Sequence, residues 1–305
     1  MASKISKYNR RTILSYTLPT IFYMAIFIVF PLAFSLYNSF KFWVVSRPDL
    51  GVYFVGFYNY WEILKSPGFH NALGNSLMFS FSFVIIEFFL GLIIALIINN
   101  FKRIEKVFSF LFILPTLMTP VIVALQWRYL LDTDYGLINW ILMKLGFITE
   151  NILWLSQYPV VIFSVIMVDV WHWTPLFFLI LLAGLKSLPT EPMEAAKIDG
   201  ANEFQILTKI KIPMMRNILI IGILIRFITS FIFFDELYIM TRGGPGIKTV
   251  VLSWFIYKTG FISWDIGKAS AASWIFVIIV ELMVMVFLRT ISEKTEKKKI
   301  TQGSI

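Results

Sequence analysis

The sequence has no cysteine and only two histidines, His70 and His172. The lack of cysteine excludes disulfides, zinc–thiolate sites and cysteine nucleophiles, and two histidines are too few for a histidine-rich metal site. The sequence also lacks a G-x-x-x-x-G-K-[ST] segment, which would cradle nucleotide phosphates. We therefore expect no bound cofactor, no metal and no nucleotide hydrolysis in this chain.

Charged residues are scarce as well. They make up 15% of the 305 residues, whereas hydrophobic residues make up 58%, and a soluble domain has about 25% charged residues. Crossing a hydrocarbon layer of about 30 Å takes roughly 20 apolar residues in a helix. The sequence therefore predicts an all-α polytopic membrane protein. Six apolar runs are expected to span the membrane, at about residues 13–36, 77–98, 107–125, 160–182, 218–234 and 271–288.

The basic residues predict the orientation of these spans. If the N-terminus is cytoplasmic, most of the 27 Lys and Arg residues fall in segments on the inner side, which is the bias of cytoplasmic loops. We expect a cytoplasmic N-terminal segment (1–12) whose apolar continuation is retained as a span, a six-helix transmembrane domain (13–290) and a cytoplasmic basic tail (291–305). The alternative, nucleic-acid binding by the basic residues 297–299, is disfavoured by this distribution.

The loop at 186–216, between the fourth and fifth runs, is polar and predicts two short helices. Pro192 suits a first helical turn, and Gly200 suits a helix end. Asn202 and Gln205 have the spacing of a capping box, and Pro213 is expected to close the second helix. Such a cytoplasmic elbow is small enough to enter a groove on a soluble partner. The alternative is a well-capped connector.

This loop resembles the EAA signature of permease subunits of ATP-binding-cassette (ABC) importers, which is E-A-A, three residues, G, nine residues, I, two residues, P. Those positions are filled by Glu194, Ala195, Ala196, Gly200, Ile210 and Pro213. The segment from Phe234-Asp235 to Gly243-Gly244-Pro245 is similar to carbohydrate permeases of the MalF/UgpA type. The resemblance covers about residues 12–290.

The resemblance implies a type I ABC importer permease fold in the cell membrane, with the elbow docked on an ATPase. Implied partners are a second permease subunit, two cytoplasmic ATPases that bind ATP and Mg, and an extracytoplasmic solute-binding protein. It also implies that the loop at Gly243, Gly244 and Pro245 lies near that binding protein, although the same residues suit a simple turn. The coupling residues it implies are Glu194, Ala195, Ala196, Asp199, Gly200, Ile210 and Pro213.

Ionisable residues inside spans are costly and usually face a bundle interior or a cavity. Here they are Glu87, Asp169, His172, Arg226, Asp235 and Glu281. The alternative for Asp235 and the neighbouring Glu236 is a position at the outer rim. They either line a solute path or pair across helices, for instance Arg226 with a carboxylate. A sugar path, with aromatic rings for stacking, is predicted at Asp169, Trp171, Trp173, Phe227, Phe231, Phe234 and Asp235. The alternative for these aromatic residues is packing.

We therefore expect an importer permease for a sugar, such as a di- or oligosaccharide. A permease for glycerol 3-phosphate is the alternative, and it would need an anion-binding cluster for which Arg226 alone is thin support. An intramembrane enzyme is disfavoured because the sequence has neither H-E-x-x-H nor G-x-S-x-G. An ion channel would leave the elbow unexplained.

Overall fold

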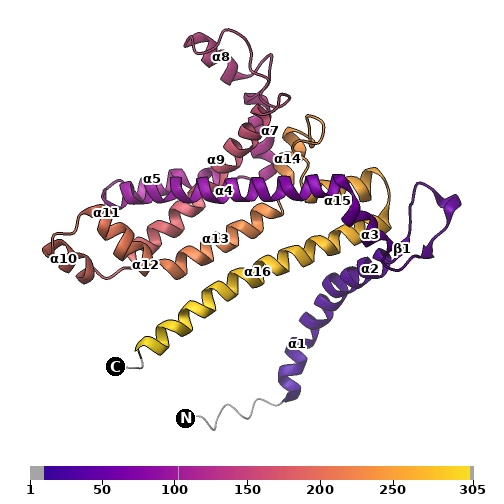
Figure 1. Cartoon of the computed structure of the whole chain (residues 1–305), viewed down its shortest axis with the longest axis horizontal. Helices are drawn as coiled ribbons and strands as arrows, with labels where there is room; N and C mark the ends of the chain where they lie inside the picture. Colours follow the sequence, from indigo (N-terminus) through magenta and orange to yellow (C-terminus); the bar gives the residue numbers. More distant parts are fainter. Residues whose placement is uncertain (1–9, 102, 303–305) are drawn as a thin grey trace. The chain divides into compact units, whose positions relative to one another are not determined.

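The computed structural model describes residues 10–101 and 103–302, with side chains from Tyr16 to Arg289. The outermost parts of the predicted terminal segments, 1–9 and 303–305, lie outside the described residues. The chain forms two compact units, one comprising residues up to Ser66 with Ile256–Val277, and the other comprising Pro67–Phe255 with the residues from Ile278 onward. Both are mainly helical (Figure 1).

The first unit contains an apolar helical run followed by a small hairpin. Its elements are α1 (Arg10–Met24), η2 (Ala25–Val29), α2 (Phe30–Ser39), β1 (Lys41–Phe42), η3 (Pro48–Leu50), β2 (Tyr53–Phe54), α3 (Tyr58–Lys65), η5 (Lys258–Ile262) and the start of α16 (Ile266–Gln302). The strands pair antiparallel, Lys41 opposite Phe54. The buried Asn59 amide donates to the carbonyls of Ser39 and Lys41, at 2.9 and 2.8 Å, and so fastens α3 to the end of α2.

The second unit holds the remaining elements. They are α4 (Pro67–Asn99), α5 (Glu105–Phe112), α6 (Leu114–Leu117), α7 (Pro120–Leu130), α8 (Leu137–Lys144), α9 (Val160–Lys186), α10 (Glu191–Ile198), α11 (Glu203–Ile206), η4 (Leu207–Lys211), α12 (Ile212–Met214), α13 (Arg216–Phe231) and α14 (Asp235–Met240). Helix α15 (Leu252–Tyr257) leads from this unit into the other along the chain.

The core of the second unit is the packing of α4 against α9, with α13 contacting both. At Gly91 of α4 an added Cβ would lie 2.9 Å from Phe177 Cβ and 3.0 Å from the Phe178 nitrogen. The missing side chain therefore lets the two helices approach closely, as small residues do in membrane bundles. Phe177 and Phe178 belong to a buried apolar cluster that also includes Leu181 and Met215.

Within the described residues, five helices are long and apolar enough to cross a membrane. They are Tyr16–Ser39, Pro67–Asn99, Val160–Lys186, Arg216–Met240 and Ile266–Arg289, close to five of the six expected spans. The run expected at 107–125 differs, because Glu105–Leu117 and Pro120–Leu130 are separate helices bent by 91°. They make a sixth span only if the bent pair is counted as one.

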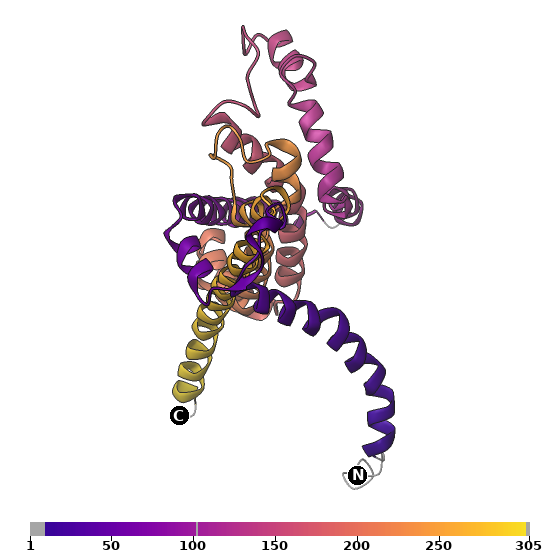
Figure 2. The same cartoon turned by 90° about the vertical axis from the view of Figure 1, so that its right-hand side faces the viewer.

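The bend has a local cause. Met118 and Thr119 have extended backbones, and α7 begins at Pro120. Proline disfavours helical geometry in the residue before it and has no N–H to continue a helix. Figures 1 and 2 both show α7 leading away from α4, with α8 at its far end. The apolar run at 107–125 therefore forms two helices, and Pro120 is the sequence signal for the break between them.

Candidate functional site

The elbow between α9 and α13 contains the first of the two predicted helices as α10. Pro192 lies in its first turn, as expected. After the helix ends, Gly200 has a φ of +83°, which glycine adopts without strain. The Gly200 amide donates to the Lys197 carbonyl at 3.1 Å, and the Ala201 amide to the Ala196 carbonyl at 2.9 Å. This double closure is a Schellman motif, which fixes the turn at the tip of the elbow.

The second predicted helix begins with the expected capping box. The Asn202 side chain accepts from the Gln205 amide at 2.8 Å, and the Gln205 side chain accepts from the Asn202 amide at 2.9 Å. The helical backbone continues without a break from α11 through η4 to the end of α12 at Met214, so Pro213 lies in the last turn of this run. The next helix, α13, begins at Arg216.

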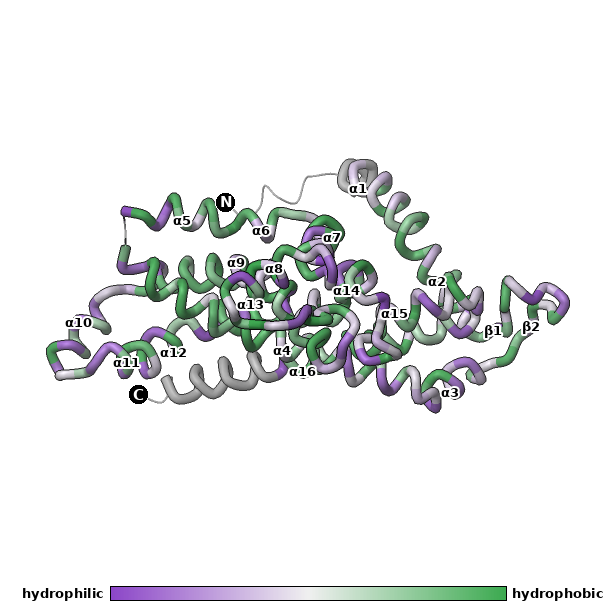
Figure 3. The backbone as a smooth tube through the Cα atoms, turned by 90° about the horizontal axis from the view of Figure 1, so that it is seen from above, coloured by the Kyte–Doolittle hydropathy of each residue, from purple (hydrophilic) through white to green (hydrophobic). Residues whose placement is uncertain are grey.

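The elbow presents two large apolar side chains to solvent. Ile198 is 87% exposed and Phe204 is 73% exposed. Of the predicted coupling residues, Glu194, Ala195, Asp199, Gly200 and Pro213 are exposed as well, whereas Ala196 and Ile210 are half-buried. Sequence interpretation overlooked Ile198 and Phe204, although a lone apolar residue in a polar loop was a usable signal. Figure 3 shows polar segments in the elbow and mainly apolar colour along the flanking α9 and α13.

A salt bridge spans the two helices of the elbow. Lys197 Nζ lies 2.8 Å from Glu203 Oε1, and this hydrogen bond lowers the pKa of the Glu203 carboxyl. Both side chains line a groove of about 630 Å³, together with Phe204, Lys211 and the end of α4 at Asn99. The elbow therefore offers a concave, mixed-polarity surface beside its exposed apolar tip.

A buried ion network joins the three core helices. Arg226 of α13 donates to both carboxylate oxygens of Glu87 in α4, with Nε–Oε2 and Nη2–Oε1 distances of 2.7 Å. Arg226 Nη2 also pairs with Asp169 Oδ1 of α9. All three side chains are buried. The predicted alternative that Arg226 pairs with a carboxylate across helices is confirmed, and the arginine pairs with two.

His172, one turn beyond Asp169 on α9, joins two further elements. Its Nε2 lies 3.2 Å from the carbonyl oxygen of Met118, at the bend between α6 and α7. Its Nδ1 lies 3.3 Å from Oε1 of Glu236 in α14. Glu236 is buried, whereas the adjacent Asp235 is exposed, so only Asp235 has the accessibility of a rim residue. His172 and Glu236 lie 64 positions apart, and no local sequence pattern predicts this pair.

The residues predicted for a sugar path have different partners. Asp169 is bound to Arg226, whose guanidinium carbon lies 5.0 Å from the centroid of a Trp173 ring. Trp171 meets Trp127 instead, at 5.5 Å between ring centroids. Phe227 and Phe231 are buried, Phe234 stacks on Tyr238 and Asp235 is exposed. The path through these residues stays a prediction.

The predicted binding-protein loop packs against α15. An added Cβ at Gly243 would lie 2.5 Å from Trp254 Nε1, so the loop is held closely there.

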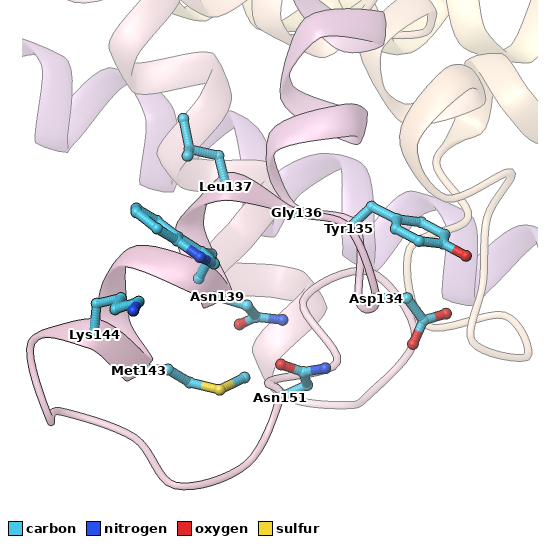
Figure 4. Close-up of a pocket in the computed structure, with 9 residues that line it drawn as sticks. Asp134, Tyr135, Gly136, Leu137, Asn139, Met143, Lys144 and Asn151 are labelled. Carbon is cyan, nitrogen blue, oxygen red and sulfur yellow. The ribbon is translucent and has the colours of Figure 1, made fainter.

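A hollow of about 480 Å³ lies at α8, where the side chains of Asn139 and Asn151 point toward it (Figure 4). Asn139 fastens this loop, because its oxygen accepts from Trp154 Nε1 at 2.9 Å. The hollow contains none of the predicted site residues.

Comparison with known proteins places this architecture in a family. Residues 87–297 match the model of the "Binding-protein-dependent transport system inner membrane component". The probable ABC transporter permease y4oQ of Sinorhizobium fredii is 36% identical over 269 residues, which cover 88% of this chain and 86% of that relative. The trehalose/maltose permease MalF of Thermococcus litoralis is 33% identical over 272 residues, covering 89% and 90%.

Two further similarities complete the comparison. The sulfoquinovosyl glycerol permease SmoG of Agrobacterium fabrum is 28% identical over 276 residues, covering 90% of this chain and 89% of that relative. A chain of a bacterial ABC transporter that imports alginate has a TM-score of 0.77 at 22% identity, covering 91% and 94% of the two chains, and so shares the fold. This chain is therefore a membrane-embedded permease subunit that belongs to the family of binding-protein-dependent transport system inner membrane components.

Proposed function

We propose that this chain is the permease subunit of an ATP-driven importer for a di- or oligosaccharide. The chain crosses the membrane six times, counting the bent pair as one span, with both termini cytoplasmic. It pairs with a second permease subunit, two cytoplasmic ATPases and an extracytoplasmic binding protein. Relatives named for trehalose/maltose and sulfoquinovosyl glycerol support a sugar as the solute.

The ion network offers no free cationic donor for glycerol 3-phosphate at Arg226. The phosphate group of that solute would need a cationic hydrogen-bond donor that is free to bind it. Arg226 is the arginine inside the predicted spans that was considered for this role. Its Nε and Nη2 are engaged by two carboxylates, and Nη1 lies 3.5 Å from Thr229 Oγ1. Two carboxylates around one guanidinium leave the site without a surplus positive charge, which disfavours an anion there.

The elbow carries the proposal of ATP coupling. It is capped at both helices, bears exposed Ile198 and Phe204 at its tip, and is connected at its two ends to α9 and α13. A partner ATPase, which binds ATP and Mg, supplies the hydrolysis that moves this tip. Because Arg226 and Asp169 tie α13 to α9, both helices follow the elbow as one body. Glu194, Asp199 and the small Ala195 form the docking face around the tip.

Substitution of Gly200 tests this proposal. Gly200→Val places a β-branched side chain at a φ of +83°, which is strained even though the space around it is open. Gly146→Val is the matched control, because Gly146 has a φ of +75° and equally open surroundings. In the reconstituted transporter, Gly200→Val should abolish stimulation of ATP hydrolysis by loaded binding protein, and Gly146→Val should preserve it. Equal stimulation in both variants would refute the coupling role of the elbow.

A further inference from the structure

His172 of α9 is bonded on both sides of its ring, and the two partners impose a constraint on its protons. On one side Nε2 faces the carbonyl oxygen of Met118 at 3.2 Å, and on the other Nδ1 faces Oε1 of Glu236 at 3.3 Å. A carbonyl oxygen only accepts hydrogen bonds, so Nε2 must carry a proton. In a neutral imidazole Nδ1 is then an acceptor, and an ionised Glu236 is an acceptor too.

Both contacts are hydrogen bonds only if the pair holds one additional proton. The proton lies either on His172, which then faces a carboxylate as an imidazolium, or on Glu236, which then donates to Nδ1. Either placement gives the same pair and the same two contacts. Without that proton, two lone pairs face each other in a buried site, where an unsatisfied polar contact is costly.

The charges around the pair favour retention of the proton. The groups facing it are Glu87 on α4, Asp169 on α9, Arg226 on α13, and Asp235 beside Glu236 on α14. The buried members Glu87, Asp169 and Glu236 are three carboxyl groups around one guanidinium. One added proton reduces this excess of negative charge, which is costly in a buried site.

The pair also connects parts of the chain with different predicted tasks. Glu236 lies in α14, which directly precedes the loop of Gly243, Gly244 and Pro245. Met118 lies at the 91° bend, where Thr116 Oγ1 donates to the His172 carbonyl at 2.6 Å. His172 itself lies on α9, whose last residues lead into the elbow. The imidazole thus contacts α14 and the bend from α9, the helix whose end leads into the elbow.

We propose that His172 and Glu236 share one proton, and that this protonated pair is a latch that couples α14 and the bend after α6 to α9. The role of the latch in transport rests on the proposed function, whereas the presence of the shared proton does not. Loaded binding protein acts on the outer loop, the latch transmits the displacement of α14 to α9, and α9 passes it to the elbow. His172 is a positioning residue in this scheme and contacts no solute.

The proton content is tested on the purified permease alone. His70 is exposed and is the other histidine of the chain, so His70→Gln leaves His172 as the single imidazole. Nitrogen-15 NMR at neutral pH should then show a protonated Nε2, with Nδ1 either protonated or accepting a hydrogen bond. A bare Nε2 with a protonated Nδ1 would overturn the shared proton, because the ring would then face the Met118 carbonyl without a donor.

The coupling role is tested by ATP hydrolysis in the reconstituted transporter, normalised to the rate without binding protein. Glu236→Gln should keep the stimulation of the wild type, because its amide donates to a neutral Nδ1 without an added proton. His172→Leu should lose stimulation. Loss of stimulation in Glu236→Gln, or full stimulation in His172→Leu, would overturn the latch.

The two proposals fail in different ways. A wild type that binding protein does not stimulate would refute the proposed function, while the NMR measurement would still decide the proton. If loaded binding protein stimulates ATP hydrolysis equally in the wild type and in the His172 and Glu236 variants, only the latch is refuted.

Discussion

Glu87 and Arg226 form a bidentate ion pair between α4 and α13, with both N–O distances at 2.7 Å. Asp169 adds one contact to the same guanidinium, and its Oδ2 has no hydrogen-bond partner among the described residues. The two carboxylates are therefore unequal. The bidentate pair fixes geometry, whereas Asp169 adds a second charge from α9.

Neutral amide variants should separate these contributions. Glu87→Gln places an amide N–H₂ against a donor, whereas Asp169→Asn keeps Oδ1 as an acceptor and puts its N–H₂ where Oδ2 lacks a partner. We expect Glu87→Gln to lower the melting temperature in detergent more than Asp169→Asn. Arg226→Met should be worse than either, since removing one partner of a buried ion pair costs roughly 3–5 kcal/mol. If Glu87→Gln and Asp169→Asn lower the melting temperature equally, the two carboxylates do not have unequal roles.

The close contact of α4 with α9 predicts opposite effects of one substitution at two glycines. Gly91→Ala forces a Cβ to within 2.9 Å of Phe177 Cβ, so the helices must separate, at a cost of about 1–3 kcal/mol. Gly74→Ala on the same helix meets no atom within 4 Å and should stabilise by about 0.5–1 kcal/mol through helix propensity. Thermal unfolding of the two variants measures both. A destabilising Gly74→Ala would show that space is not the deciding factor.

The exposed tip of the elbow predicts a loss of binding to the ATPase. Phe204→Ser should reduce co-purification of the ATPase subunits without lowering the melting temperature of the permease, because an exposed ring stabilises a partner contact rather than the fold. Phe147→Ser is the control, since Phe147 is 74% exposed and Phe204 is 73% exposed. Loss of the ATPase in both variants, or in neither, would argue against a specific anchor.

The bridge between Lys197 and Glu203 predicts how the elbow responds to acid. The folded chain lowers the pKa of Glu203, so the bridge stabilises the elbow above the ordinary value of 4.5 and loses this effect as the pH falls through the lowered folded value. Amide exchange of the elbow should therefore show no change in bridge-dependent protection between pH 6 and 8. It should accelerate only in acid below pH 4.5, once intrinsic exchange is corrected. Lys197→Met should remove that acid step, and an acid step that persists in the variant would assign it to another group.

The features predicted correctly from the sequence depend on residues that lie close together in the chain. The helix caps of the elbow depend on residues only a few positions apart, as Gly200 and the Asn202–Gln205 pair show. The apolar runs likewise located the long helices. Pro213 likewise lies one residue before the end of the second helical run of the elbow.

The sequence did not predict which ionisable residues far apart in the chain pair with one another. Asp169, His172 and Arg226 were recognised as unusual inside spans, but their partners are set by the packing of α4, α9, α13 and α14. The Glu87–Arg226 contact joins residues 139 positions apart, and His172–Glu236 joins residues 64 positions apart. No local pattern encodes such distances. Ile198 and Phe204 differ from these pairs, because each is an apolar residue in a polar loop and its exposure has a local sequence signal.

Asp169 and His172 lie three residues apart on α9, so the ion network and the His172–Glu236 pair use one stripe of that helix. Inserting or deleting one residue turns everything beyond it by about 100° and shifts it by about 1.5 Å. A single-residue deletion between Asp169 and His172 would therefore keep composition and hydropathy almost unchanged yet leave only one of the two contacts in register. The length of this stretch of α9 is thus more constrained than the identity of its lipid-facing residues, and a deletion scan along the helix would reveal that constraint.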